Sequence, residues 1–285
     1  MKMTRRIMFS ASKSDWIVTR SEAENREIFG ENATPEPYGH NYFLNVTVEG
    51  KINPITGIIL NIKQIDRLVK ESVIHRLDKS NLNLTLNDTP VTSETLTLWI
   101  RDRVSEGLPT EVRLSSIRIE ETPLDAIEWS NESESRSSSQ KKASNTMLLT
   151  RVYEFAASHR LHSPHLSEDE NQELFGKCHY PNGHGHNYIL EVTVSGEVNP
   201  RDGRVVKPET LDTIVNDQVV DRYDHRHLNL DFPEFEATIP STEILTKIIW
   251  ERLEPKIPPP AQLYRVLIRE TSRNIFEYYG EDLKS

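Results

Sequence analysis

The stretch Gly185-His186-Asn187-Tyr188-Ile189-Leu190-Glu191-Val192-Thr193-Val194 ends in alternating apolar and polar side chains, the pattern of a half-buried β-strand. Its first four residues also occur 146 positions earlier, as Gly39-His40-Asn41-Tyr42. Without a gap, the same shift pairs residues along much of the chain: Phe9 with Phe155, Asn25 with Asn171, Gly57 with Gly203 and Asp78 with Asp224. After a small insertion, a shift of 149 pairs Glu121 with Glu270. The chain therefore contains two copies of one unit.

The length and the composition agree with two domains. A chain of 285 residues is long enough for two domains that each bury their own core. Between the copies, a polar segment with almost no apolar side chains predicts a flexible tether. We therefore predict a first repeat at 1–129, a flexible linker at 130–147 and a second repeat at 148–285.

Each repeat is predicted to be an α+β unit. In the second repeat, the alternating runs 188–194 and 263–268 predict strands. Apolar residues at helical spacing predict a helix at 208–223, with Pro208 in its first turn, and another that begins near a Ser241 cap. The order of strand pair, helix, helix and strand pair predicts an antiparallel four-stranded sheet with two helices on one face.

The charge and the cysteine content exclude several classes of function. The chain has 34 basic and 44 acidic residues, so its formal charge of -10 argues against binding to nucleic acid or to an anionic membrane. No apolar run approaches the roughly 20 residues that span a bilayer, and the opening residues lack the apolar core of a secretory signal, so we expect a cytoplasmic protein. A single cysteine, Cys178, rules out an intrachain disulfide and a multi-cysteine zinc site.

Three histidines form a candidate metal site. His184 and His186 are two positions apart on a predicted strand, which places both imidazoles on one face. His159 ends another alternating stretch, 153–161, and is a candidate third ligand from a neighbouring strand. Three neutral histidines with an open fourth position are typical of catalytic zinc, although these residue types also suit iron or cobalt.

Cys178 lies in the loop that leads to His184. A thiol near a divalent cation and Lys177 has its thiolate favoured, which makes it a competent proton acceptor at neutral pH. The alternative is a buried and chemically inert cysteine.

Five motifs occur in order over essentially all of 148–280. They are Phe155-Ala156-Ala157-Ser158-His159-Arg160-Leu161, 174–188, 223–231, Pro240-Ser241-Thr242-Glu243 and Arg269-Glu270-Thr271. Together these motifs resemble the 6-pyruvoyltetrahydropterin synthase family. The family's unit is the tunnelling fold (T-fold), with two strand pairs and two helices, so the resemblance implies two tandem T-fold units.

The resemblance implies a role for each matching position. Zn²⁺ is the implied cofactor, and the proton relay is completed by a pair that a neighbouring subunit supplies. The pterin ring is anchored by a carboxylate, which can accept two hydrogen bonds from its amino and ring N–H groups. The implied zinc ligands are His159, His184 and His186, the catalytic base is Cys178, the relay pair is Asp224 and His225, and the substrate-binding residues are Glu270 and Thr242.

The implied reaction is a carbon-oxygen lyase reaction of tetrahydrobiopterin biosynthesis. It converts 7,8-dihydroneopterin triphosphate, a small molecule, to 6-pyruvoyltetrahydropterin with elimination of triphosphate. The family's rings imply a homo-oligomer, a trimer of tandem chains that forms a pseudo-hexamer, with an even number of chains in a different ring as the alternative.

Two other functions remain open. One is 6-carboxytetrahydropterin synthase of queuosine biosynthesis, which typically has a shorter loop than the five residues between Cys178 and His184. The other is a non-catalytic scaffold that binds a pterin or a metal.

The first repeat lacks most of the candidate site. Lys13, Asn32 and Tyr38 stand at the positions of His159, Cys178 and His184, and Lys79 stands at that of His225. A single imidazole, His40, cannot hold catalytic zinc. We therefore predict a degenerate repeat that keeps the fold. Two carboxylates remain, either as remnants or as groups lent to a shared pocket: Asp78 and Glu121.

Overall fold

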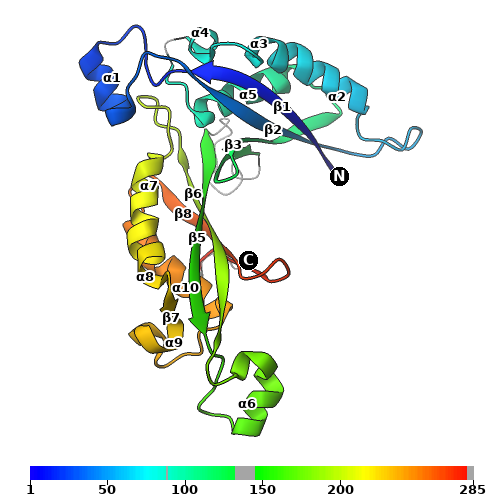
Figure 1. The fold of residues 1–285 in the computed structure, drawn as a ribbon. Helices are drawn as coiled ribbons and strands as arrows, with labels where there is room; N and C mark the ends of the chain where they lie inside the picture. Colours follow the sequence, from blue (N-terminus) through cyan, green and yellow to red (C-terminus); the bar gives the residue numbers. More distant parts are fainter. Residues whose placement is uncertain (88, 132–144, 281–285) are drawn as a thin grey trace. The chain divides into compact units, whose positions relative to one another are not determined.

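The computed structural model describes residues 1–87, 89–131 and 145–280 (Figure 1). The chain divides into two compact units, of which the first comprises Met1–Leu149 with Ser195–Val205 and the second comprises Thr150–Val194 with Val206–Ser285. Most of the predicted linker lies outside the described residues. At its edges, Ser130 ends strand β4 (Asp125–Ser130) and Thr146 begins strand β5 (Thr146–His159).

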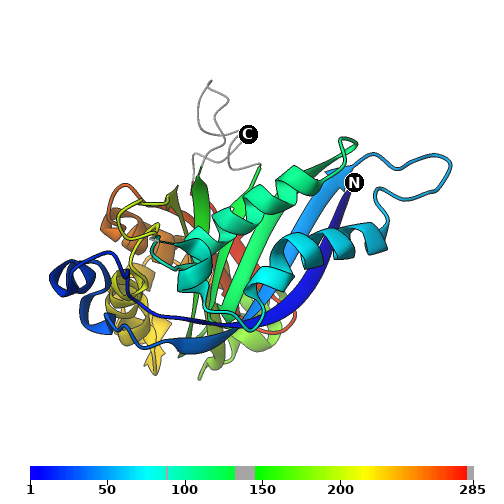
Figure 2. The same cartoon turned by 90° about the horizontal axis from the view of Figure 1, so that it is seen from above.

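The first unit contains an antiparallel sheet in the order β1-β2-β3-β4. Strand β1 (Lys2–Lys13) pairs along its whole length with β2 (Tyr38–Gly50), and β3 (Val112–Thr122) follows. Figure 2 shows helices α2 and α5 lying across one face of this sheet. The helices of the unit are α1 (Glu22–Phe29), α2 (Ile62–Val69), α3 (His75–Leu77), α4 (Leu82–Leu86) and α5 (Ser93–Gly107).

The second unit repeats this plan with the strand order β5-β6-β8-β9. The predicted T-fold architecture is therefore confirmed, and a two-residue strand β7 (Arg226–His227) also pairs in parallel with β5. No helix within the described ranges is both long and apolar enough to cross a membrane. The other elements are β6 (His184–Glu197), β8 (Gln262–Arg269), β9 (Ile275–Tyr278), α6 (Glu168–Phe175), α7 (Pro208–Val215), α8 (Asp221–Tyr223), α9 (Leu228–Asp231) and α10 (Thr242–Leu253).

The predicted helix at 208–223 contains one irregular turn. Between α7 and α8 the chain forms a π-helical turn, Asn216–Val220, and the first repeat forms the same turn at Lys70–Ile74. These two turns are 146 positions apart, like the matched residues of the sequence. A π turn changes the direction of the residues that follow it, so both repeats present the Asp78 and Asp224 positions in the same way.

Each core is built around a matched aromatic pair. Phe9 stacks on Tyr42 with ring centroids 4.9 Å apart, and Phe155 stacks on Tyr188 at 5.1 Å. All four rings are buried. Burial of each ring stabilises the fold by about 1.5–3 kcal/mol, and the pairs fix the strands whose ends carry the candidate site.

Sequence analysis did not predict helices α1 and α6. Both begin with a capping box, in which Ser21 and Glu24, or Ser167 and Glu170, exchange side-chain and backbone hydrogen bonds. The signal, Ser followed three residues later by Glu, is present in the sequence and was overlooked.

Residues 195–205, the end of β6 and the loop after it, group with the first unit and form two hydrogen bonds with it. The hydroxyl of Thr92 donates to the Gly203 carbonyl at 2.6 Å, and the Val205 N–H donates to Glu94 Oε1 at 3.2 Å. Glu94 is buried, and this burial raises the pKa of its carboxyl group. The division into compact units therefore differs from the division into sequence repeats.

Candidate active site

The second unit brings three histidines together at the ends of two strands. His159 is the last residue of β5, and His184 and His186 open β6. One ligand nitrogen from each ring lies within 4.8 Å of the other two. The ring centroids are 4.6 to 5.3 Å apart, so the side chains that the sequence singled out share one small volume.

The nitrogens that face this volume have no partner among the described residues. They are His159 Nε2, His184 Nδ1 and His186 Nε2, all buried. His159 Nδ1 lies 2.7 Å from the Pro240 carbonyl, which only accepts, so Nδ1 carries the proton and Nε2 presents its lone pair. Burial lowers the pKa of His159 and of His184, which favours neutral rings. Three imidazole nitrogens without a hydrogen-bond partner fit a divalent ion such as zinc.

Glu270 lies beside the three histidines, directly after strand β8. Its Oε1 atom is 3.7 Å from His186 Nε2 and 3.9 Å from His159 Nε2. Thr242, the first residue of α10, donates to Oε1 at 2.5 Å, and the Asn274 amide donates to Oε2 at 2.9 Å. Burial raises the pKa of Glu270, but these hydrogen bonds outweigh it and the net pKa is lowered. The carboxylate is therefore ionised and fixed in orientation.

Cys178 is a free and partly buried thiol in the short helix Gly176–His179. Its carbonyl accepts a hydrogen bond from the Leu161 N–H at 2.9 Å, which ties the helix to the segment after β5. Burial and the nearby Glu270 carboxylate raise the pKa of this thiol. Lys177 was expected to lower the pKa of this thiol, but the pKa is raised. A lowered thiol pKa therefore depends on a bound cation.

Asp224 and His225 form a hydrogen-bonded pair that is anchored on β5. Asp224 Oδ2 lies 2.8 Å from His225 Nδ1, and its other oxygen accepts from the Ala156 N–H at 2.7 Å. The His225 N–H donates to the Ala156 carbonyl, which holds His225 at a φ of 57°, and its side chain is 84% exposed. The hydrogen bonds from Ala156 and His225 lower the pKa of Asp224. The exposed ring is free to reach a neighbouring molecule.

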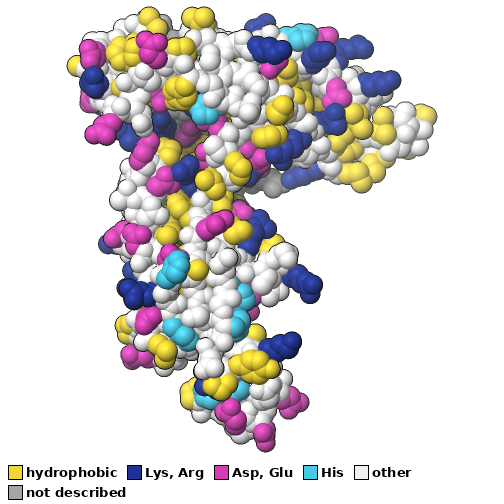
Figure 3. All heavy atoms as spheres, in the orientation of Figure 1, with side chains coloured by type: hydrophobic (Ala, Val, Ile, Leu, Met, Phe, Trp, Pro, Cys, Tyr) yellow, Lys and Arg dark blue, Asp and Glu magenta, His cyan; other side chains and the backbone are white. Residues whose placement is uncertain are grey.

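A shallow groove runs beside this pair. Figure 3 shows histidine side chains, in cyan, that reach the surface of the second unit. The groove lies over β5, β6 and the β7 segment, and its lining includes Ser158, His186, His225, Arg226 and Asp231. Asp224 and His225, in the turn before β7, therefore lie in the same unit as the histidine cluster at the ends of β5 and β6.

In the first repeat, the positions that correspond to His159 and Glu270 form a largely buried ion pair. Lys13 Nζ lies 3.0 Å from Glu121 Oε1 and 3.3 Å from Oε2, and the Ser93 hydroxyl also donates to Oε1. The Tyr38 hydroxyl donates a hydrogen bond to Asp15 Oδ2 at 2.7 Å. Among the described residues, no histidine-rich metal cluster occurs in this repeat. The Lys13 ammonium group therefore lies beside the retained Glu121 carboxylate, at the position that His159 occupies in the second repeat.

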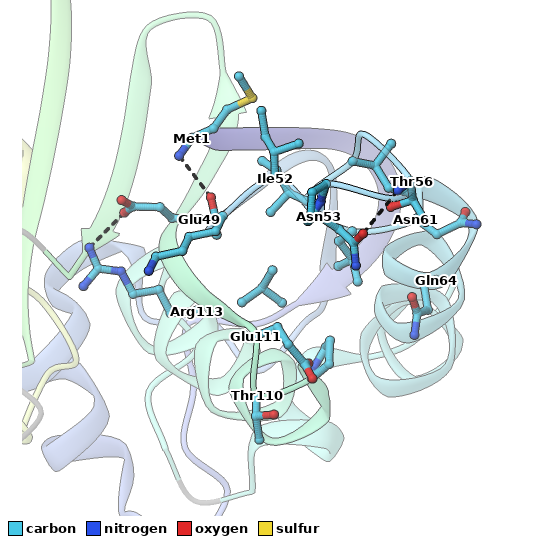
Figure 4. Close-up of a pocket in the computed structure, with 18 residues that line it drawn as sticks. Met1, Glu49, Ile52, Asn53, Thr56, Asn61, Gln64, Thr110, Glu111 and Arg113 are labelled. Atoms are coloured by element: carbon cyan, nitrogen blue, oxygen red, sulfur yellow. Dashed lines mark hydrogen bonds and ion pairs between the residues drawn. The ribbon is translucent and has the colours of Figure 1, made fainter.

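The first unit also contains a larger pocket at the loop between β2 and α2 (Figure 4). At the rim of the pocket, the amino group of Met1 donates a hydrogen bond to the Gly50 carbonyl, and Arg113 forms an ion pair with Glu49 at 2.9 Å. Its lining contains neither histidine nor cysteine. None of the residues that sequence analysis selected lies there.

Three supporting positions were missed from the sequence. The Pro240 carbonyl orients His159, and the Asn274 side chain orients Glu270. Gly183 has a φ of 65°, and a Cβ there would lie 2.7 Å from the His159 carbonyl oxygen, so the turn before His184 requires glycine. Only Gly183 gave a signal, because its neighbours Asn182 and His184 place it in a turn.

Comparisons with known proteins agree with this architecture. A family model described as "6-pyruvoyl tetrahydropterin synthase" matches residues 3–132 and 148–281. The human "6-pyruvoyl tetrahydrobiopterin synthase" is 43% identical over 133 residues, which are 47% of this chain and 91% of that protein. The "Dihydroneopterin monophosphate aldolase" of Pyrococcus furiosus is 35% identical over 84 residues, 30% of this chain and 69% of that protein.

Among solved structures, the Caenorhabditis elegans 6-pyruvoyl tetrahydropterin synthase is 42% identical, with a TM-score of 0.46 over 48% of this chain and 96% of that one. The human relative matches about one repeat, whereas the family model matches both repeats and most of the chain. The chain is therefore a tandem member of the 6-pyruvoyl tetrahydropterin synthase family.

Proposed function

We propose that the second repeat is a zinc-dependent lyase that converts 7,8-dihydroneopterin triphosphate to 6-pyruvoyltetrahydropterin and releases triphosphate. The observation that carries the proposal is the convergence of three unpartnered imidazole nitrogens beside a fixed carboxylate. The names of the human and C. elegans relatives support this reaction class. The chain has one such cluster in the described part of its second repeat and none in that of its first, so one working site per chain is expected.

Glu270 would bind the pterin ring. Its carboxylate can accept hydrogen bonds from the amino group and a ring N–H of the substrate, as it would from a guanidinium group. Thr242 and Asn274 hold the two oxygens, so little conformational entropy is lost on binding. Because the pKa of Glu270 is lowered, the group remains a charged acceptor at neutral pH.

His159, His184 and His186 would hold the zinc ion. When bound, zinc would act as a Lewis acid on the side-chain oxygens of the substrate and increase the acidity of the adjacent C–H bonds. The hydrogen bond from His159 to Pro240 keeps that ring in the tautomer a metal requires.

Cys178 and His225 would transfer protons. Burial and Glu270 raise the pKa of the Cys178 thiol in the protein alone, so the base form becomes available when a cation offsets that carboxylate. Asp224 keeps a proton on His225 Nδ1 and leaves Nε2 to exchange protons with substrate. The 84% exposure of His225 agrees with a role across a subunit boundary, in a homo-oligomer such as a trimer of tandem chains.

Product analysis tests the proposal. Zinc-loaded protein is incubated with 7,8-dihydroneopterin triphosphate, and the pterin product and free triphosphate are identified by mass spectrometry. The pyruvoyl product with triphosphate release is expected, while Cys178→Ala should lose activity and retain zinc. A carboxylated product with acetaldehyde would assign the queuosine-pathway reaction instead. Zinc and pterin binding without turnover would indicate a scaffold.

A further inference from the structure

A second histidine cluster lies in the lobe formed by α6 and the segments on either side of it. Figure 1 shows this lobe, in bright green, beyond the ends of β5 and β6. One ligand atom from each of His162, Glu168 and His179 lies within 4.8 Å of the others. The two imidazole rings stack at 5.1 Å with an interplanar angle of 19°. None of these residues belongs to the histidine set of the candidate active site.

His179 faces one acceptor with each ring nitrogen. Its Nδ1 lies 3.1 Å from the Leu161 carbonyl, and its Nε2 lies 2.8 Å from Glu168 Oε1. A neutral ring donates to only one of these acceptors, whereas a metal ion on Nε2 with the proton on Nδ1 satisfies both. His162 Nδ1 is buried and has no partner among the described residues, which a proton on His179 does not explain.

The first repeat holds the equivalent lobe together by apolar contacts. There, Ile17, Ile28 and Phe29 are buried in one cluster, with Ala33 packed against it. The matched positions in the second repeat include His179 in place of Ala33 and Leu174 in place of Ile28. Ile28 is 4% exposed, but Leu174 is 64% exposed. This lobe of the second repeat therefore buries less apolar surface, and one position of the apolar cluster carries a ligand side chain.

The guanidinium of Arg160 opposes a cation in this cluster. Its Nη2 lies 3.2 Å from His179 Nε2 and 3.9 Å from Glu168 Oε1. The guanidinium is also tethered through Nε to the His179 carbonyl at 2.9 Å, and its side chain is 26% exposed. Because the guanidinium is planar, Nη2 moves together with Nε, so binding of an ion requires the whole group to leave the carboxylate and give up its Nε hydrogen bond.

We propose that His162, Glu168 and His179 form a second divalent-cation site, with zinc as the ion that suits two imidazoles and one carboxylate. Ligand atoms on one zinc ion lie roughly 3.4 Å apart, for bonds of about 2.0–2.1 Å, so small rotations of these side chains complete the set. The ion links the segment after β5, the first turn of α6 and the residue that follows Cys178. It stabilises the lobe in place of the apolar cluster of the first repeat.

Metal counting on the full chain tests this site. Metal-free protein is reconstituted with zinc and desalted, and the bound zinc is measured by mass spectrometry for wild type and for Glu168→Gln, His162→Trp and Glu173→Gln. Glu168 is 71% exposed, so its amide variant should fold, and tryptophan is the residue of the first repeat at the His162 position. Each of the first two variants should bind one zinc fewer per chain. Glu173, an exposed acid of the same helix outside the cluster, is the matched control and should bind as wild type does.

The result also separates this site from the proposed active site. His186→Ala should remove a different ion, so the double variant with Glu168→Gln should lose both. If His159, His184 and His186 bind no zinc, Glu168→Gln should still contain one zinc ion fewer per chain than wild type. The second site is therefore tested independently of the proposed active site. Equal zinc content in wild type and in both cluster variants would show that a proton occupies the contact and would overturn it. A zinc-dependent rise in melting temperature that is smaller in Glu168→Gln than in wild type is the second expected readout.

Discussion

Lys13→Met in the first repeat should destabilise the fold strongly at neutral pH. The Lys13 and Glu121 side chains are only 10% and 13% exposed, with nitrogen and oxygen 3.0 Å apart. Removal of one member of a buried pair costs about 3–5 kcal/mol, because the other charge stays buried without compensation. The hydroxyl of Ser93 still donates to Glu121, so we expect the lower end, about 3 kcal/mol. For a unit of this size, that corresponds to a fall in melting temperature of about 6–12 °C.

The pH dependence of this loss identifies its cause. Burial raises the pKa of Glu121, but the Lys13 ammonium outweighs it, so the folded pKa lies below the unfolded value. The pair therefore contributes stability above the unfolded pKa of about 4.3 and loses it as the pH falls through the folded pKa. In Lys13→Met, burial dominates and the pKa rises, so the deficit should shrink as the pH falls towards that raised value.

Urea unfolding from neutral to acidic pH measures the difference, with Lys13→Met/Glu121→Gln as the matched control. The double variant should recover more than half of the lost stability, because no buried charge remains. A deficit that is independent of pH, or a double variant no more stable than Lys13→Met, would refute the buried ion pair as the cause.

Three further outcomes concern the second repeat. Glu270→Gln should retain zinc but bind the pterin substrate about 1.5–3 kcal/mol more weakly, as measured by calorimetry, because a charged acceptor is lost. Loss of zinc in this variant would instead indicate that Glu270 is a metal ligand. The pKa values of His159 and His184 are lowered, mainly by burial, so their ring nitrogens should remain unprotonated below the ordinary histidine value of about 6.5. A pH titration followed by metal analysis should therefore show that zinc is retained below that pH. Ser241→Ala removes the cap that accepts from the Ile244 N–H and should cost about 1 kcal/mol in thermal unfolding, and a change near zero would contradict the cap.

The sequence was sufficient for the architecture because its periodic signals are local. Alternation predicted the strands, and the Pro208 and Ser241 signals predicted the starts of the two helical segments, which the structure places at Pro208 and Thr242. The π turn between α7 and α8 could not be predicted, because its extra residue does not interrupt the apolar pattern. Helix α6 was missed because an eight-residue polar helix has little apolar periodicity, although its capping box was present.

The candidate site was predictable where residue type carries the chemistry. The sequence pattern selected His184 and His186 by their spacing and His159 as a third ligand from a neighbouring strand, and the structure brings the three rings together. The residues that orient the site act through backbone or amide groups that no local pattern reveals, as with the Pro240 carbonyl and Asn274. Side-chain chemistry can be inferred from a linear pattern, but long-range hydrogen-bond partners depend on the fold.

Both repeats keep the same carboxylate arrangement, although only one keeps the histidines. In each, a glutamate at the end of an inner strand or directly after it accepts a hydrogen bond from the hydroxyl of the first residue of the long helix, from Ser93 to Glu121 and from Thr242 to Glu270. The difference lies at the end of the first strand of each repeat, where Lys13 neutralises one carboxylate and His159 leaves the other available. The fixed carboxylate is therefore a property of the fold, and the strand-end residue determines whether it forms an internal ion pair or faces a ligand.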